Sequence, residues 1–202
     1  MSRSVNQKGF TLLELLIATT IFSTILLLCT FGLINVGNIY YKGLITSRTQ
    51  NATRNVMDTL SQSIQFGGSN LRVIPSAPAE DPITHVRKLV DSSSIDKSGA
   101  ICVGDTRIQY NRSTQVSDTE WALKTDKSTT CSVDGRAGKE LLGDGMQITK
   151  LDITEVNGDY TITLNVAHAK TTELDSDNCK GGADSKYCAS VNLTTTVHRR
   201  VE

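Results

Sequence analysis

A single carboxylate lies inside the most apolar stretch of the sequence. Between Phe10 and Tyr41 the only charged residue is Glu14. A carboxylate one turn inside an apolar, membrane-type helix costs on the order of 2 to 3 kcal/mol unless another group compensates for it. We therefore expect this side chain to have a specific purpose.

The cysteines are the second set of residues that could do chemistry. Cys29 lies in the apolar stretch, whereas the other four lie in the polar part of the chain, at Cys102, Cys131, Cys179 and Cys188. An even number of cysteines in an exported domain predicts two disulfides. Of the three connectivities we favour the sequence-local one, Cys102 with Cys131 and Cys179 with Cys188. Reduced, unrelated thiols in a cytosolic protein are the alternative.

Other kinds of chemistry have little support. The sequence has no zinc-type cysteine pair, no His-Glu-X-X-His and no Gly-rich phosphate loop, and its histidines, His85, His168 and His198, are isolated. The acidic loop 175–185 could offer oxygen ligands to calcium, but Cys179 stands where a ligand is needed, so we favour a solvated loop. We predict no catalytic residue, no metal and no cofactor. The 21 basic and 21 acidic residues indicate no nucleic-acid partner.

The apolar stretch must be carried by a long helix. Residues 10–41 exceed the roughly 20 that a helix needs to cross a bilayer, and they also exceed the core of a cleaved secretory signal. The helical pattern continues beyond them, because Val56, Leu60 and Ile64 recur every four residues. Glycines after Phe66 predict a helix end in the left-handed conformation. The basic residues before the stretch predict a cytoplasmic leader and an exported head.

Residues Lys8 to Leu15, KGFTLLEL, resemble the processing site of type IV prepilins. The resemblance implies that a prepilin peptidase cuts between Gly9 and Phe10 and methylates the new N-terminus at Phe10. Glu14 would then meet the α-ammonium of a neighbouring subunit and set the register of a filament. Further partners implied are other pilin-like subunits and the assembly platform in the inner membrane. A generic signal anchor with a stray glutamate is the alternative.

The polar part of the chain predicts antiparallel strands. The clearest signal is a hairpin, Met146–Val156 and Tyr160–Ala167, around Asn157-Gly158-Asp159. Weaker strand patterns cover Ile101–Val103, Arg107–Tyr110, Glu120–Lys124 and Ala189–Val197. We interpret Trp121, in the third of these, as a core residue or partly buried anchor. The order of these features also resembles the larger minor pseudopilins.

The sequence therefore predicts an α+β fold, a long N-terminal helix packed against an antiparallel β-sheet head with disulfides. Four segments are expected: a leader 1–9, a transmembrane and filament-core helix 10–41, its continuation 42–66, and a head 67–202. We interpret the chain as a minor pilin or pseudopilin, single-pass in the cell membrane, with its head outside the cytoplasm in a surface or periplasmic filament. Residues 10–41 lack the proline common in major pilins. A major pilin, or a membrane-anchored binding domain that does not polymerise, stays open as an alternative.

Overall fold

The computed structural model describes residues 10–67, 71–75, 86–92, 97–112, 114–117, 120–135, 137–175, 177–180 and 187–200. The expected leader 1–9, with Gly9, and much of the acidic loop 175–185 lie outside the described residues. Contacts divide the chain into two units, Met1–Tyr41 and Lys42–Glu202. We describe each unit by itself and call the second the head.

One helix, α1 (Leu12–Phe66), accounts for all 55 residues between these bounds. The predicted helix is confirmed, and it begins two residues later than Phe10. In the first unit α1 has a window with a mean hydropathy of 2.3 and no buried residue, so its length and composition suit a membrane span. In the head one stripe of α1 is buried, and this stripe comprises Thr49, Thr53, Val56, Met57, Leu60 and Ile64.

The long strands of the head form a four-stranded antiparallel sheet in the order β11-β8-β7-β2. Its members are β2 (Arg87–Val90), β7 (Met146–Val156), β8 (Asp159–His168) and β11 (Ala189–His198). The predicted hairpin is confirmed: Val156 pairs with Asp159 and leaves a two-residue turn. Asn157 and Gly158 have φ of 52° and 87° there. Two positive φ values are typical of the type I′ turn that matches the twist of a hairpin.

A second antiparallel sheet has the order β1-β3-β4-β5-β6. Its strands are β1 (Leu71–Ile74), β3 (Ser98–Val103), β4 (Thr106–Asn111), β5 (Leu123–Lys127) and β6 (Lys139–Glu140). A short 3-10 turn, η1 (Thr171–Glu173), precedes a pair of two-residue strands, β9 (Leu174–Asp175) and β10 (Asn178–Cys179). The strand expected at Glu120–Lys124 begins only at Leu123 and continues to Lys127. Its start is displaced because the Glu140 carboxylate accepts hydrogen bonds from the backbone of Ala122 and Leu123.

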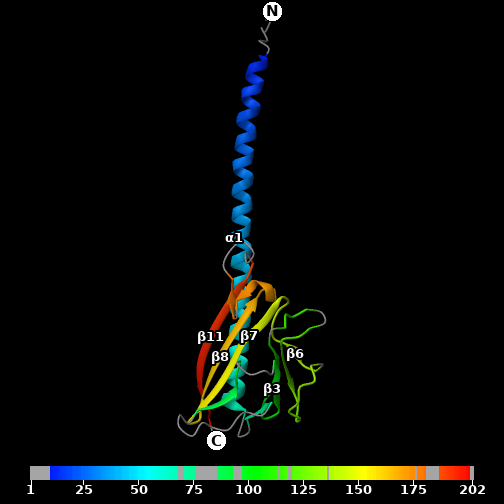
Figure 1. Cartoon of the computed structure of the whole chain (residues 1–202), viewed down its shortest axis with the longest axis vertical. Helices are drawn as coiled ribbons and strands as arrows, with labels where there is room; N and C mark the ends of the chain where they lie inside the picture. Colours follow the sequence, from blue (N-terminus) through cyan, green and yellow to red (C-terminus); the bar gives the residue numbers. More distant parts are fainter. Residues whose placement is uncertain are drawn as a thin grey trace, which may run out of the picture. The chain divides into compact units, whose positions relative to one another are not determined.

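The core of the head is built from both sheets and the second half of α1. In Figure 1 the long strands β7, β8 and β11 lie over the cyan part of α1. The largest fully buried side chains come from all three layers and include Leu60, Ile101, Ile108, Leu123, Ile148, Leu151, Ile153, Ile162 and Leu164. Two disulfides, Cys102–Cys131 and Cys179–Cys188, have the sequence-local pairing, and Cys29 is free and exposed.

The first glycine after α1, Gly67, makes a close approach to β3 and is not in the left-handed conformation, and the second, Gly68, lies outside the described residues. Gly67 follows the last helical residue, but its φ is not among the positive values. A Cβ atom at this position would lie 2.2 Å from Val103 Cγ1 and 2.4 Å from the Ser63 carbonyl oxygen. Gly67 is thus required because β3 passes directly over the helix end. The expected left-handed conformation is not found at this residue.

Gly67→Ala is expected to destabilise the head by about 1–3 kcal/mol, because the added methyl group overpacks the contact between α1 and β3. Thermal unfolding of the full chain in detergent, followed by circular dichroism, measures this loss. Gly43→Ala is the matched control, because a Cβ atom at Gly43 meets nothing within 4 Å. The control should unfold at or above the wild-type temperature. Equal effects of the two substitutions would contradict the close-approach account.

Tyr160, near the start of β8, makes the stability of the head depend on pH in the alkaline range. Its side chain is buried, and its hydroxyl donates to Glu155 Oε1 at 3.2 Å. Burial, followed by the charge of Glu155, raises the pKa of Tyr160 above its ordinary value. A raised pKa in the folded state contributes stability that is present below about pH 10 and is lost as the pH rises through the folded pKa.

The unfolding temperature of the wild type is therefore expected to fall more steeply between about pH 10 and pH 12 than that of Tyr160→Phe. Scanning calorimetry of both chains across this interval measures the difference. Phe cannot ionise, and the lysines titrate in both proteins. The difference in unfolding temperature between the two proteins at each pH therefore reports the ionisation of Tyr160 alone. If this difference in unfolding temperature stayed constant with pH, the ionisation of Tyr160 would not cause the loss of stability.

Candidate processing and assembly segment

The helix α1 begins with a reciprocal cap formed by Thr11 and Glu14. The Thr11 backbone N–H donates to Glu14 Oε2 at 3.0 Å, and the Thr11 hydroxyl donates to the same oxygen at 2.9 Å. In return the Glu14 backbone N–H donates to Thr11 Oγ1 at 3.3 Å. This is a capping box, in which residues three apart satisfy each other's free backbone donors. The Thr-X-X-Glu spacing of Thr11 and Glu14 is the sequence signature of such a box, although Glu14 was expected only to pair with a neighbouring subunit.

The cap leaves part of the Glu14 carboxylate available. Both bonds from Thr11 go to Oε2, and within the described residues no hydrogen bond to Oε1 is found. An incoming cation could therefore bind Oε1 while the helix start stays capped. The carboxylate also lies at the positive end of the helix dipole, which stabilises a negative charge. The preceding residue, Phe10, is 83% exposed.

The threonines of the apolar segment do not compete with Glu14 for partners. The hydroxyls of Thr19, Thr20, Thr24 and Thr30 donate to backbone carbonyls three or four residues earlier, at 2.8 to 3.0 Å. Such bonds satisfy a hydroxyl within the helix itself, which is a requirement in an apolar medium. The segment therefore presents an apolar surface on which one charged side chain, Glu14, is available for recognition.

The large apolar side chains of this segment are exposed in the single chain. They include Leu12, Leu13, Ile21, Phe22, Leu27, Leu28, Phe31 and Leu33, whose exposed fractions range from 55 to 82%. Exposed apolar surface of this extent marks a site that is covered by lipid or by other polypeptides. The geometry of the segment therefore suits insertion into a membrane and packing against similar helices.

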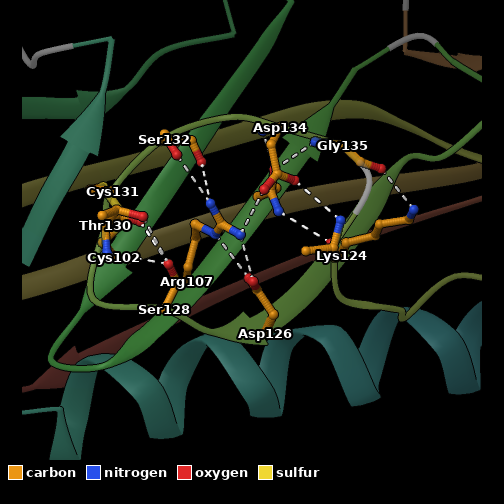
Figure 2. A network of polar contacts seen from close by, with 12 residues as sticks. Cys102, Arg107, Lys124, Asp126, Ser128, Thr130, Cys131, Ser132, Asp134 and Gly135 are labelled. Carbon is orange, nitrogen blue, oxygen red and sulfur yellow. Dashed lines mark hydrogen bonds and ion pairs between the residues drawn. A yellow bond between two sulfur atoms is a disulfide. The ribbon is translucent and has the colours of Figure 1, made fainter.

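A buried polar cluster lies in the head, far from this segment in the sequence. Figure 2 shows Arg107 of β4 between two acidic side chains. Its Nε donates to Asp126 Oδ1 at 2.9 Å, its Nη2 contacts Asp134 Oδ2 at 3.2 Å, and its Nη1 donates to the Ser132 carbonyl at 3.0 Å. The hydrogen bond to Asp126 is the main cause that raises the pKa of Arg107. From the sequence, Arg107 was expected only as the first residue of a strand.

The Arg107 cluster is structural rather than reactive. Arg107 is 3% exposed and pairs in register with Asp126, so the guanidinium joins β4 to β5. Through Ser132 and Asp134 it also fixes the loop that follows Cys131, which the disulfide to Cys102 holds at its other end. Within the part of the chain that the structure describes, no group of three His, Cys, Asp or Glu side chains is arranged to hold a metal ion.

Comparison with known proteins identifies the N-terminal segment. The family model described as the prokaryotic N-terminal methylation motif matches residues 5–30, and this motif is the type IV prepilin-like signal. No curated protein and no solved structure matches the chain significantly. The matched residues include Gly9, Phe10 and Glu14, so the expected resemblance to prepilins is confirmed.

Proposed function

We propose that this chain, whose N-terminus carries the type IV prepilin-like signal, is a minor pilin or pseudopilin. It is a structural subunit of a type IV pilus or of a related secretion or uptake filament. A prepilin peptidase cuts between Gly9 and Phe10 and methylates Phe10, and the first half of α1 anchors the chain in the membrane before assembly. The head then lies outside the cytoplasm, in a surface or periplasmic filament built with other pilin-like subunits on an inner-membrane platform.

The observation that carries this proposal is the combination of the methylation motif with a lone carboxylate on an exposed apolar helix. Glu14 has a free Oε1, and the methylated α-ammonium of a neighbouring Phe10 is the cation that processing would create. Pairing the two compensates both charges within the apolar filament core. A membrane-anchored domain that does not polymerise would keep residues 1–9 and would need this carboxylate only as a helix cap, which occupies Oε2 and leaves Oε1 without a function.

The choice of a minor over a major subunit rests on the helix. The segment 10–41 contains no proline, and α1 continues without a break from Leu12 to Phe66. A proline would remove a backbone hydrogen bond and would give the helix a defined kink. The major pilin of the filament is the second candidate, and abundance in the filament distinguishes it.

Mass spectrometry of the N-terminal peptide tests the proposal. The chain should be recovered both from native membranes and from sheared filaments. A peptide that begins at N-methylated Phe10 in the filament fraction is the expected result, at an amount well below that of the principal subunit. An abundance equal to that of the principal subunit would favour the major pilin. An intact leader found only in membranes would exclude processing and polymerisation.

A further inference from the structure

A surface pocket of about 440 Å³ lies in the head, between the β4–β5 connection and the turns on both sides of β6. Trp121, the only tryptophan of the chain, forms one of its walls and is half-buried. Val116 and Leu142, which are 7% and 5% exposed, form an apolar floor. The volume falls within the range that small-molecule sites occupy.

The wall beside Trp121 is held by several independent contacts. Gly135 has a φ of 64°, and a Cβ atom there would lie only 2.6 Å from Trp121 Nε1, so the glycine backbone packs directly on the indole. Lys124 Nζ donates to the Gly135 carbonyl at 2.8 Å, as Figure 2 shows, and lies 5.9 Å from the centre of the indole ring. The fully buried Gln109 accepts the backbone N–H groups of Asp134 and Gly135.

The Arg107 cluster and the Cys102–Cys131 disulfide thus position the residues from Cys131 to Gly135, and Gly135 lines the pocket. A guanidinium, an amide and a disulfide together join this segment to the sheet. Loops fixed in this way on a rigid scaffold commonly carry binding residues. The wall of the pocket formed by Trp121 and Gly135 is therefore held in place by the fold.

Three carboxylates line the pocket, and they are not equivalent. Glu140 accepts the backbone N–H groups of Ala122, Leu123 and Leu142, so its function is structural. Glu120 and Asp144 are exposed, and within the described residues neither side chain has a hydrogen-bond or ion-pair partner. Lys124 is the one cation among the described lining residues, so together with the three carboxylates these residues carry a formal charge of −2.

We propose that this pocket binds a neutral or amino-bearing pyranose sugar of a glycan. The C–H face of a pyranose is apolar and weakly positive, which suits the accessible part of the electron-rich indole of Trp121. Its hydroxyl groups donate charge-assisted hydrogen bonds to the free carboxylates of Glu120 and Asp144. The Ser117 hydroxyl, also at the pocket, adds a neutral donor and acceptor.

The charge of the pocket defines the class of sugar further. An acidic sugar would place its carboxylate among Glu120, Asp144 and Glu140, where like charges repel it. An amino sugar would gain an ion pair at the same position. This site lies wholly in the head, so it does not depend on whether the chain polymerises, and a failure of the test below leaves the proposed filament role untouched.

The experiment uses the full-length chain in detergent. A glycan array selects candidate sugars, and each is then titrated while the fluorescence of Trp121, the chain's only tryptophan, is followed. We expect a saturable change with a neutral or amino-bearing pyranose, with a Kd of about 1 mM for a monosaccharide. N-acetylneuraminic acid serves as the acidic comparison and should give no saturable change.

Two isosteric variants establish the site. Glu120→Gln and Asp144→Asn keep the shape of the pocket and are each expected to weaken binding at least about tenfold. Asp58→Asn is the matched control, because Asp58 is an exposed carboxylate on α1 outside the pocket. The unfolding temperature of each variant verifies that it is folded. The proposal is overturned if no array sugar changes the fluorescence, if only acidic sugars bind, or if both folded variants bind as tightly as Asp58→Asn.

Discussion

Glu14→Gln is expected to reduce the amount of this chain in sheared filaments at least about tenfold, while its amount in the membrane stays equal to that of the wild type. The substitution removes the charge that would pair with the Phe10 α-ammonium of a neighbour. It keeps the capping box, because glutamine at this position can also accept the Thr11 backbone N–H. An uncompensated charge in the apolar core costs about 2 to 3 kcal/mol, and every 1.4 kcal/mol corresponds to a factor of ten.

Thr11→Ala is the matched control for this prediction. It removes the hydroxyl that donates to Glu14 at 2.9 Å but leaves the carboxylate and its charge in place. Losing a cap costs about 1 kcal/mol at the helix start, so Thr11→Ala should retain most of its assembly. Quantitative immunoblots of filament and membrane fractions compare the variants. If Thr11→Ala failed as completely as Glu14→Gln, helix capping rather than charge pairing would explain the function of Glu14.

Helices and strands in which apolar residues recur at a regular spacing were predictable from the sequence. Elements whose bounds depend on contacts with distant residues were not. The α1 stripe of Val56, Leu60 and Ile64 and the hairpin around Asn157-Gly158 depend on local spacing, and both are confirmed. The strands β1 and β2 have only four residues each, too few to show an alternation. The start of β5 depends on Glu140, which lies 17 residues from Leu123.

Polar contacts between residues close in the sequence were likewise predictable, and polar contacts between distant residues were not. The Thr11–Glu14 cap has a local signature and could have been found from its spacing. The pairing of Arg107 with Asp126 could not, because it follows from the register between β4 and β5, which no local pattern specifies. The Trp121 pocket also needs three separated segments to come together. The N-terminal segment could be interpreted from its residues because its motif lies within six consecutive residues, Gly9 to Glu14.

Arg107→Leu is expected to destabilise the head by about 2–3 kcal/mol, because it removes the charge-assisted hydrogen bonds to Asp126 and leaves this carboxylate, whose side chain is only 14% exposed, without its guanidinium. The same change releases Asp134 and the Ser132 carbonyl, and so loosens the loop after Cys131. For a head of this size the loss corresponds to a fall in unfolding temperature on the order of 10 °C. The raised pKa of Arg107 means that its charge is kept throughout the pH range below about 12.

Scanning calorimetry of the oxidised chain measures this change, and two further variants define its cause. Lys127→Gln removes an exposed cation whose pair with Asp105, at 3.8 Å, is largely exposed to water, so it should shift stability by less than about 1 kcal/mol. Arg107→Leu combined with Asp126→Leu removes both members of the main buried pair and should recover part of the loss. If the double variant were as unstable as the sum of the single ones, the cost would come from packing around β4 and β5 rather than from an unpaired buried charge.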